Sequence, residues 1–265
     1  MRTALLVLFL ALTGLRPAFA DPGPSQCLAV AEAPAHIQPV SIRVISVEKD
    51  QVRLTFIGHS TFRIETAGGI TVATDYAGWA GANVVPDVVT MNHAHATHYT
   101  DSPDPRIRHV LRGWNPAGGA AKHDLEVGDV RIRNVPTDIR LWGGGMEPDS
   151  NSIFIFEVAG LCIGHLGHLH HELRPEHIGL IGRLDIVMVP VDGSYTMAQA
   201  NMIEVLKALR ARLVLPMHYF GPSTLSRFLA GMGKEFEVEV KSEPTMVVSM
   251  ATLPEAPKIV ILPGY

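Results

Sequence analysis

Histidines gather at three places in this chain, and each place follows an apolar run that is typical of a β-strand. The runs cover residues 88–91, 161–166 and 213–217, and the histidine stretches are 93–98, 165–171 and 218. A lone histidine after a strand is usually structural, but three groups after three separate strands are hard to explain by chance. Because a rigid strand aims the loop residues that follow it, the pattern favours a layered fold with a site at the strand ends.

Other short runs of apolar and β-branched residues predict further strands, separated by turns that contain Gly or Pro. The expected strands are residues 42–47, 52–57, 62–66, 70–74, 88–91, 130–135, 152–158, 161–166, 184–191, 213–217, 246–250 and 259–262, with another near Val238. A capping box at residues 196–199 and apolar positions at helical spacing predict an amphipathic helix as far as Arg212, and residues 223–231 predict a short one. The sequence therefore predicts a strand-rich α/β domain.

The composition supports a folded domain and excludes one class of partner. Hydrophobic residues make up 47% of the 265 residues and charged residues 18%, which is enough for a buried core. Lys and Arg number 22 against 26 Asp and Glu, so no basic excess is present to bind a phosphate backbone. We therefore expect no nucleic-acid partner.

The first 20 residues predict a secretory signal peptide. Arg2 precedes an apolar run over residues 4–12, and Ala18-Phe19-Ala20 fits a cleavage site. The run is too short to span a membrane comfortably, although an uncleaved anchor is the alternative. Residues 21–40 are rich in Pro and Ala and predict a linker or arm, which leaves 41–265 for the domain. The mature protein is expected to be exported, to the periplasm or the medium, with no membrane association after cleavage.

Export would permit a disulfide, and the chain has two cysteines, Cys27 in the expected arm and Cys162 in an expected strand. Their positions along the chain do not establish whether they meet. A bridge between them, and a buried free Cys162 beside an incidental Cys27, both stay open.

The stretch that contains His93, His95 and His98 has the spacing of a metal site. In an extended loop His93 and His95 point to the same side, and His98 can face the same space from the following turn. Converging imidazoles suit Zn²⁺, which takes nitrogen ligands at about 2.0–2.1 Å. A solvated histidine-rich loop is the alternative, but the apolar strand that enters the loop argues against it. His168 and His218, after the other strands, are further candidates.

These histidines belong to a series of motifs whose order resembles the metallo-β-lactamase superfamily, and within it the branch of L-ascorbate-6-phosphate lactonase and related metal-dependent hydrolases. The motifs are Phe56-Ile57-Gly58-His59-Ser60-Thr61, Thr74-Asp75, the loop 93–98, His165-Leu166-Gly167-His168, Val189-Pro190-Val191-Asp192-Gly193 and Leu215-Pro216-Met217-His218-Tyr219. The ordered set is specific, although each motif alone is weak. The resemblance implies an α/β fold, an αββα sandwich in a single domain, with a metal site at one edge.

The metal ligands implied by the resemblance are partly altered in this chain. Those that match the family directly are His93, His95, His98 and His218. Thr97 stands where the family loop, His-x-His-x-Asp-His, has an aspartate that binds a second metal. The family's bridging aspartate falls on His168, and Asp138 is the nearest candidate where the family has another histidine. The changes suggest a rebuilt site for one or two zinc ions, or for another transition metal that imidazoles accept.

The resemblance implies a hydrolase in which a metal-bound hydroxide attacks an ester, lactone or phosphodiester of a small, anionic substrate. His59 and Asp75 match family positions beside the metal and could orient its ligands, and Tyr219 could donate to a developing negative charge. His59 could equally be a turn residue, and Tyr219 could simply pack beside its strand. Two other functions stay open: a non-catalytic metal-binding protein with a closed ligand set, and hydrolysis of β-lactams. The sequence predicts no oligomeric state.

Overall fold

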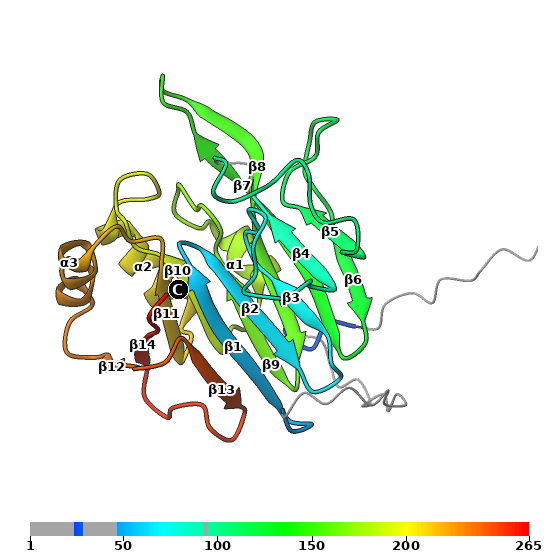
Figure 1. Ribbon diagram of the computed structural model, residues 1–265. Helices are drawn as coiled ribbons and strands as arrows, with labels where there is room; N and C mark the ends of the chain where they lie inside the picture. The colour runs from blue at the N-terminus through cyan, green and yellow to red at the C-terminus, as the bar shows by residue number, and fades with distance from the viewer. Residues whose placement is uncertain (1–23, 29–46, 93–94, 265) are drawn as a thin grey trace, which may run out of the picture.

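The computed structural model describes residues 24–28, 47–92 and 95–264, whose strands form two sheets (Figure 1). The first sheet consists of β1 (Gln51–Gly58), β2 (Thr61–Thr66), β3 (Thr71–Ala73), β4 (Val88–Met91), β5 (His109–Arg112) and β13 (Thr245–Ser249). The second consists of β6 (Asp124–Val127), β7 (Val130–Arg140), β8 (Met146–Val158), β9 (Leu161–His165), β10 (Ile186–Pro190), β11 (Leu213–Met217), β12 (Glu237–Val240) and β14 (Lys258–Ile261). The strand orders are β13-β1-β2-β3-β4-β5 and β12-β14-β11-β10-β9-β8-β7-β6.

Most strands predicted from the apolar runs are present. The run expected at 42–47 lies outside the described residues except for Val47, which is not in a strand. Two strands, β5 and β6, lie in the segment 101–126, where Pro and Gly interrupt every local pattern and no strand was predicted. Both have four residues and depend on a neighbour: β5 pairs with β4, and β6 pairs with β7.

The space between the two sheets holds a large apolar core. Val52, Leu54 and Phe56 alternate along β1 and meet Phe154 and Phe156 of β8 across this space. Side chains alternate along a strand, so a shift of one residue in register would turn the apolar set towards solvent. This core therefore fixes how the two sheets lie against each other.

Three helices cover the outer face of the second sheet. They are α1 (Pro175–Ile181), which the sequence did not predict, α2 (Gln199–Leu209) and α3 (Pro222–Met232). Because β9, β10 and β11 are covered on both faces, every residue in them is buried, which explains their unbroken apolar runs. None of the helices in the described residues is long and apolar enough to cross a membrane.

The outer face of the first sheet is covered differently. Loop residues Tyr76, Ala80 and Ile107 pack there on Val89 and Met91 of β4. The predicted α/β sandwich is thus confirmed, but its fourth layer is made of loops rather than helices in the residues that the structure describes.

The start of α2 differs from the predicted capping box. The residue before the helix is Ala198, which makes no side-chain capping bond. The Thr196 hydroxyl donates instead to the Asp192 carboxylate, and the Gln199 amide donates to the carbonyls of Val191 and Thr224. The prediction was wrong because the helix begins later than expected: Thr196 lies two residues before the N-cap residue, Ala198, and its side chain is held by the buried carboxylate of Asp192.

Part of the expected linker is docked on the domain. Cys27 is buried and forms a disulfide with Cys162 of β9, and Ser25 and Gln26 donate hydrogen bonds to the Glu157 carboxylate. Arg133 pairs with the same carboxylate from β7. The bridge that the sequence left open is therefore present, and residues 24–28 are a fixed strap rather than a free arm.

Replacing Cys162 with Ser should lower the free energy of unfolding by about 2–5 kcal/mol, because the bridge restrains a long loop in the unfolded chain. The two cysteines are 135 residues apart. Denaturant unfolding of residues 21–265 measures the change, and Cys27→Ser should match it. Wild-type protein kept under strong reductant is the control. Equal stability of oxidised wild type and Cys162→Ser would contradict this role for the bridge.

Candidate metal centre

Four histidines meet at one edge of the sandwich: His59, His95, His98 and His218. Their candidate ligand atoms all lie within 4.8 Å of one another. His59 follows β1, His95 and His98 lie in the loop after β4, and His218 follows β11. Parallel pairing brings the ends of β3 and β4 together in one sheet and those of β9, β10 and β11 together in the other. We call these four residues the histidine group.

The His98 ring is held by a carboxylate on one side and left free on the other. Its Nδ1 lies 2.7 Å from Asp75 Oδ2 and 3.1 Å from the Ser60 hydroxyl. Its Nε2 is buried and has no hydrogen-bond partner within the described residues. An Nδ1–H that donates to a carboxylate leaves the lone pair on Nε2, which is the form of histidine that binds a metal.

His218 repeats this arrangement from the opposite sheet. Its Nδ1 lies 3.1 Å from Asp192 Oδ1, and its Nε2 is also buried without a partner in the described part of the chain. Unpaired buried polar atoms are rare and costly. Two of them on neighbouring imidazoles fit a cation, which would accept both lone pairs. The residues present therefore fit the metal that the resemblance implies.

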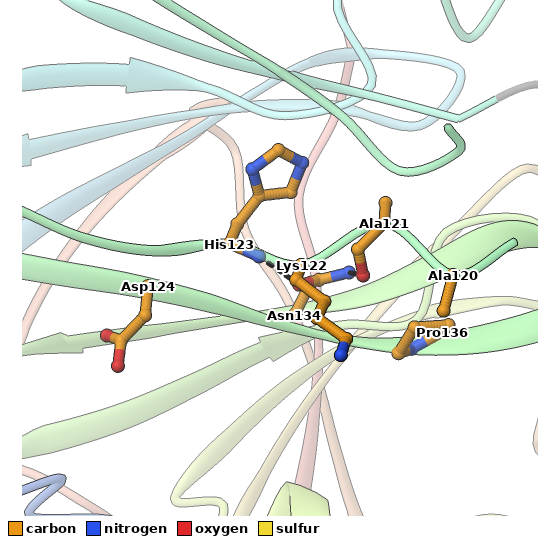
Figure 2. A pocket seen from close by; sticks show the side chains of 7 residues that line it. All are labelled: Ala120, Ala121, Lys122, His123, Asp124, Asn134 and Pro136. Atoms are coloured by element: carbon orange, nitrogen blue, oxygen red, sulfur yellow. Dashed lines mark hydrogen bonds between the residues drawn. The ribbon is translucent and has the colours of Figure 1, made fainter. Parts of the chain in front are cut away.

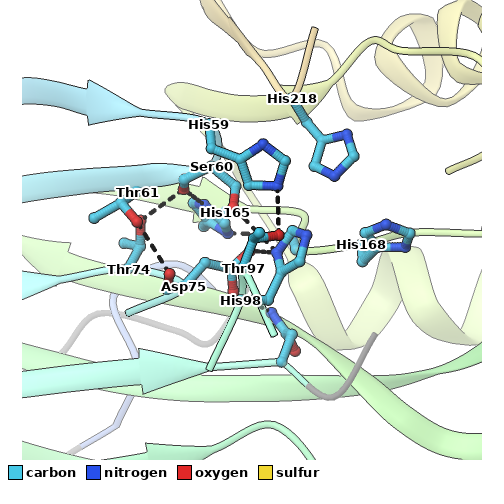
Figure 3. A network of polar contacts seen from close by, with 12 residues as sticks. His59, Ser60, Thr61, Thr74, Asp75, Thr97, His98, His165, His168 and His218 are labelled. Atoms are coloured by element: carbon cyan, nitrogen blue, oxygen red, sulfur yellow. Dashed lines mark hydrogen bonds and ion pairs between the residues drawn. The ribbon is translucent and has the colours of Figure 1, made fainter. Parts of the chain in front are cut away.

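Asp75 is fixed by a buried network (Figure 3). The Asn92 amide donates to Asp75 Oδ1 at 2.7 Å, and the Asn92 carbonyl oxygen accepts the backbone N–H of Ser152 from β8. Burial opposes ionisation of the Asp75 carboxyl, but the His165 and His98 rings and the hydrogen bonds outweigh it and lower its pKa below the ordinary value. Asp75 is thus an anion that positions His98, which is one of the roles expected for it.

Asp192 does the same for His218, and the sequence did not assign it a role. Its Oδ2 accepts backbone N–H groups of Ser194 at 2.8 Å, Tyr195 at 2.6 Å and Thr196 at 3.1 Å. Burial opposes its ionisation, yet the hydrogen bond with His218 and those from the turn lower its pKa. An Asp followed by Gly-Ser at the end of an apolar strand is the signal that could have predicted such a turn.

Thr97 connects two members of the histidine group. Its hydroxyl lies 2.8 Å from His59 Nε2 and 2.7 Å from His95 Nδ1. Burial, reinforced by neighbouring histidines, lowers the pKa of His59 to about 3 and that of His95 to about 4. Both rings are therefore neutral at pH 7, and a neutral imidazole keeps a lone pair for a metal. His59, expected as a catalytic or orienting residue, is a member of the group itself.

His168 lies against the histidine group from β9. Its Nε2 is 3.1 Å from His95 Nε2, and its ring centroid is 4.8 Å from that of His98 and 4.9 Å from that of His218. Its backbone N–H donates to the side chain of Asn151. Gly167 is required before it, since φ is +59° and a Cβ would come within 2.4 Å of Asn92 Nδ2. The position expected for His168 as a ligand is consistent with this contact.

The structure does not bring two other predicted residues to the group, and a third is not described. Asp138 accepts the backbone N–H of Asp149, while its neighbour Thr137 reaches the buried Asn151. Asp138 is not a member of the histidine group, and its neighbour Thr137 is the buried residue at this point of β7, so the ligand role expected for Asp138 stays a prediction. Tyr219 packs against the core under α2 and α3. His93 lies outside the described residues.

Two neighbours of the predicted residues, to which the sequence assigned no role, also lie in this region. Phe220, next to Tyr219, places its ring centroid 5.3 Å from that of His218. His165 uses both ring nitrogens inside the protein: Nε2 donates to the Ser60 carbonyl and Nδ1 accepts the Gly167 N–H. His165 is thus a structural histidine.

A shallow cavity of about 410 Å³ opens beside the histidine group. It is lined by Ile57, Gly58, His59, Thr61, Ala77, Trp79, Ala96 and Thr97. Another cavity, of about 320 Å³, lies around His123, whose Nε2 donates to the Arg112 carbonyl (Figure 2). The residues that line this second cavity include no member of the histidine group, so the first is the one placed for a substrate.

Comparison with known proteins gives a consistent result. The model of the beta-lactamase superfamily domain matches residues 53–218, which include the whole histidine group. A UPF0173 metal-dependent hydrolase of Opitutus terrae is 31% identical over 199 residues, 63% of this chain and 85% of the relative. One of Pelotomaculum thermopropionicum is 26% identical over 196 residues, 63% of this chain and 84% of the relative.

Solved structures agree with the fold. A Thermotoga maritima protein assigned to the Zn-dependent hydrolases of the metallo-beta-lactamase superfamily is 27% identical with a TM-score of 0.58, covering 80% of this chain and 98% of that one. A metallo hydrolase from Ignicoccus hospitalis is 19% identical with a TM-score of 0.53, over 81% of this chain and 97% of that one, and supports the fold alone. The narrower resemblance to the lactonase branch stays a prediction.

Replacing Asp75 with Asn should weaken zinc affinity about 10–100-fold. The Asn92 amide donates to Oδ1, so the new NH₂ would face His98 Nδ1 and force the ring proton onto Nε2. Competition with a chromogenic chelator measures the affinity, and circular dichroism checks the fold.

Asp138→Asn is the matched control, since this carboxylate lies away from the histidine group. It should bind zinc like the wild type. A loss of affinity in Asp138→Asn equal to that in Asp75→Asn would show that the ligands are assigned incorrectly.

Proposed function

Because the chain belongs to the beta-lactamase superfamily and is a metal-dependent hydrolase, we propose that it cleaves an ester, lactone or phosphodiester bond in a small anionic molecule. The observation that carries the proposal is the pair of buried, unpaired Nε2 atoms on His98 and His218. Each is fixed by a carboxylate behind its ring, so both lone pairs are prepared before any ligand arrives.

We propose zinc as the metal, held by His95, His98 and His218 with His59 or His168 beside them. A set of imidazoles suits zinc, although copper, iron and nickel also accept such ligands. When bound, the ion would supply a water of lowered pKa and would polarise the oxygen that gains charge during hydrolysis. One ion is favoured over two because Thr97, a neutral residue tied to His59 and His95, stands where the family has a carboxylate ligand.

An anionic substrate is supported by the distribution of charge. The histidine group contains no carboxylate, and the two carboxylates of the site, Asp75 and Asp192, lie behind the rings of His98 and His218. The face that a substrate would meet therefore has no negative side chain within the group. A cation held there attracts an anion more strongly than one surrounded by carboxylates would.

The protein residues divide the remaining work between them. Asp75 and Asp192 hold protons on the Nδ1 atoms of His98 and His218 and keep those rings in place. Thr97 fixes the planes of His59 and His95. Tyr219 has no part in this proposal, because burial raises the pKa of its hydroxyl and its ring packs on the core.

The test uses zinc-loaded protein, residues 21–265, and four chromogenic or pH-linked probes: bis(4-nitrophenyl) phosphate, 4-nitrophenyl acetate, a δ-lactone and a chromogenic β-lactam. Elemental analysis should give about one zinc per chain, since the described residues contain one histidine group, whose four candidate ligand atoms lie within 4.8 Å of one another and suit a single tetrahedral ion. We expect turnover of at least one of the first three probes, its loss with a chelator and its return with zinc.

In the same assay His98→Ala should lower kcat/KM by at least about 100-fold, because it removes one of the two prepared lone pairs. His109→Ala, on β5, is the histidine control and should keep the activity. Zinc binding without turnover of any probe would favour the non-catalytic metal-binding protein. Turnover of the β-lactam alone would favour β-lactam hydrolysis.

We also propose that the protein is exported. Two independent features support this: the signal-peptide pattern of residues 1–20, and the disulfide, a bond that persists in oxidising compartments. Cys27 lies after the expected cleavage site and would stay in the mature chain. On fractionation of cells that express the full chain, we expect an N-terminus at Asp21 outside the cytoplasm, with both cysteines oxidised. A cytoplasmic chain that starts at Met1 would contradict the proposal.

A further inference from the structure

Exposed aromatic side chains are concentrated around the histidine group. Among the described residues, the aromatic side chains that are exposed are those of Trp79, Trp142, Tyr195 and Phe220. Trp79 lines the cavity beside His59, Phe220 lies 6.0 Å from the same ring between centroids, and Tyr195 and Trp142 follow Phe220. Aromatic surface left in water is unfavourable, so its accumulation beside a site indicates a surface that a ligand covers.

Three of these residues form a continuous row that leads away from the site. The Phe220 ring centroid lies 5.3 Å from that of His218 and 6.0 Å from that of His59. Tyr195 follows at 5.4 Å from Phe220, and Trp142 at 5.9 Å from Tyr195. We call Trp142, Tyr195 and Phe220 the aromatic row. Phe220 contacts two members of the histidine group, so a ligand bound at the histidine group could extend from there along the row.

The row is positioned by the same groups that position the histidines. Phe220 comes two residues after His218, and the Tyr195 N–H donates to Asp192, the carboxylate behind His218. Trp142 lies at the tip of the β7–β8 hairpin, which projects from the sandwich (Figure 1). Arg140, at the base of that tip, donates to the carbonyls of Ser194 at 2.8 Å and Thr196 at 3.3 Å, which ties the hairpin to the Tyr195 turn.

We propose that the aromatic row is a subsite for an apolar, ring-sized group of the substrate, whose anionic part lies at the histidine group. The proposal rests on the proposed function for the reaction and adds a substrate class: small anionic molecules that carry an aryl group next to the bond that is cleaved. Trp142 is 94% exposed and Phe220 61%, so a bound ring would remove much apolar surface from water. Edge and face contacts between aromatic rings add to this gain.

The test measures binding rather than turnover, by calorimetry on the zinc-loaded protein with phenylphosphonate and methylphosphonate. The two probes share the anionic group and differ only in the apolar group. We expect phenylphosphonate to bind about tenfold tighter, which is the size of gain that a ring packed on aromatic surface gives.

Substitutions in the aromatic row show which residues give phenylphosphonate its higher affinity. Phe220→Ala should bring the affinity ratio of the two probes close to one, because Phe220 is the member of the row that lies beside His218, and Phe220→Tyr should keep most of the ratio. Val240→Ala, an exposed apolar residue of β12, is the control and should leave the ratio unchanged. Trp142→Ala should lower the ratio less than Phe220→Ala, because Trp142 lies at the far end of the row.

Several outcomes would overturn the proposal: equal affinity for the two probes, no binding of either, or a ratio that falls only in Trp79→Ala, which would place the ring in the cavity instead. A dimer that Phe220→Ala converts to a monomer with an unchanged ratio would mean that the row is an interface. Failure of the proposed function is a separate result. A phenyl preference that Phe220→Ala removes, without turnover of any probe, would support the row and reject the hydrolysis.

Discussion

The buried contact between Asp75 and His98 is the constraint on which the site depends. A carboxylate with no exposed surface is tolerated only when its oxygens have partners, and here Asn92 donates to one oxygen and His98 contacts the other. Asn92 in turn accepts the backbone N–H of Ser152, so this single network joins the end of β3, the loop after β4 and β8 of the facing sheet. Separation of the two sheets at this edge would leave a buried anion without partners.

The backbone of the site also carries strain that this packing must offset. His59, Asp75 and His218 all have positive φ, at +52°, +42° and +52°, a region that costs non-glycine residues about 1–3 kcal/mol each. The backbone N–H of His218 donates to the His59 carbonyl at 2.6 Å, which couples two of these bends across the sheets. A sharp bend directly after a strand turns the side chain back over the strand end. The strain therefore explains how the segments after β1 and β11 present His59 and His218 to the same point, with Asp75 turned behind His98.

The sequence was sufficient for the features that depend on local pattern and for those carried by the family resemblance. Apolar runs predicted most strands, and histidines at the strand ends predicted the edge where the site lies. Features set by tertiary contacts were missed or left open: Asp192 behind His218 and Phe220 beside it were missed, and the disulfide of Cys27 was left open. Thr196 and Gln199 show the reason most clearly, since their spacing is that of a capping box, while a buried carboxylate and two distant carbonyls take their hydrogen bonds instead. The same holds for Asp138, because the sequence does not show which of two neighbours on β7 is buried, and in the structure it is Thr137.

The site combines a rigid part with an adjustable one, and this combination has a physical reason. Asp75, Asp192 and Thr97 fix the imidazoles through hydrogen bonds of 2.7 to 3.1 Å, as metal binding requires when each ligand must point at one ion. Trp142 is carried instead by a hairpin tip with glycines at positive φ at 144 and 145, joined to the body through Arg140. Selection among apolar groups needs contact area rather than exact angles, so a projecting tip can meet rings of different size without disturbing the ligands. The two requirements are met by different segments because no single loop could satisfy both.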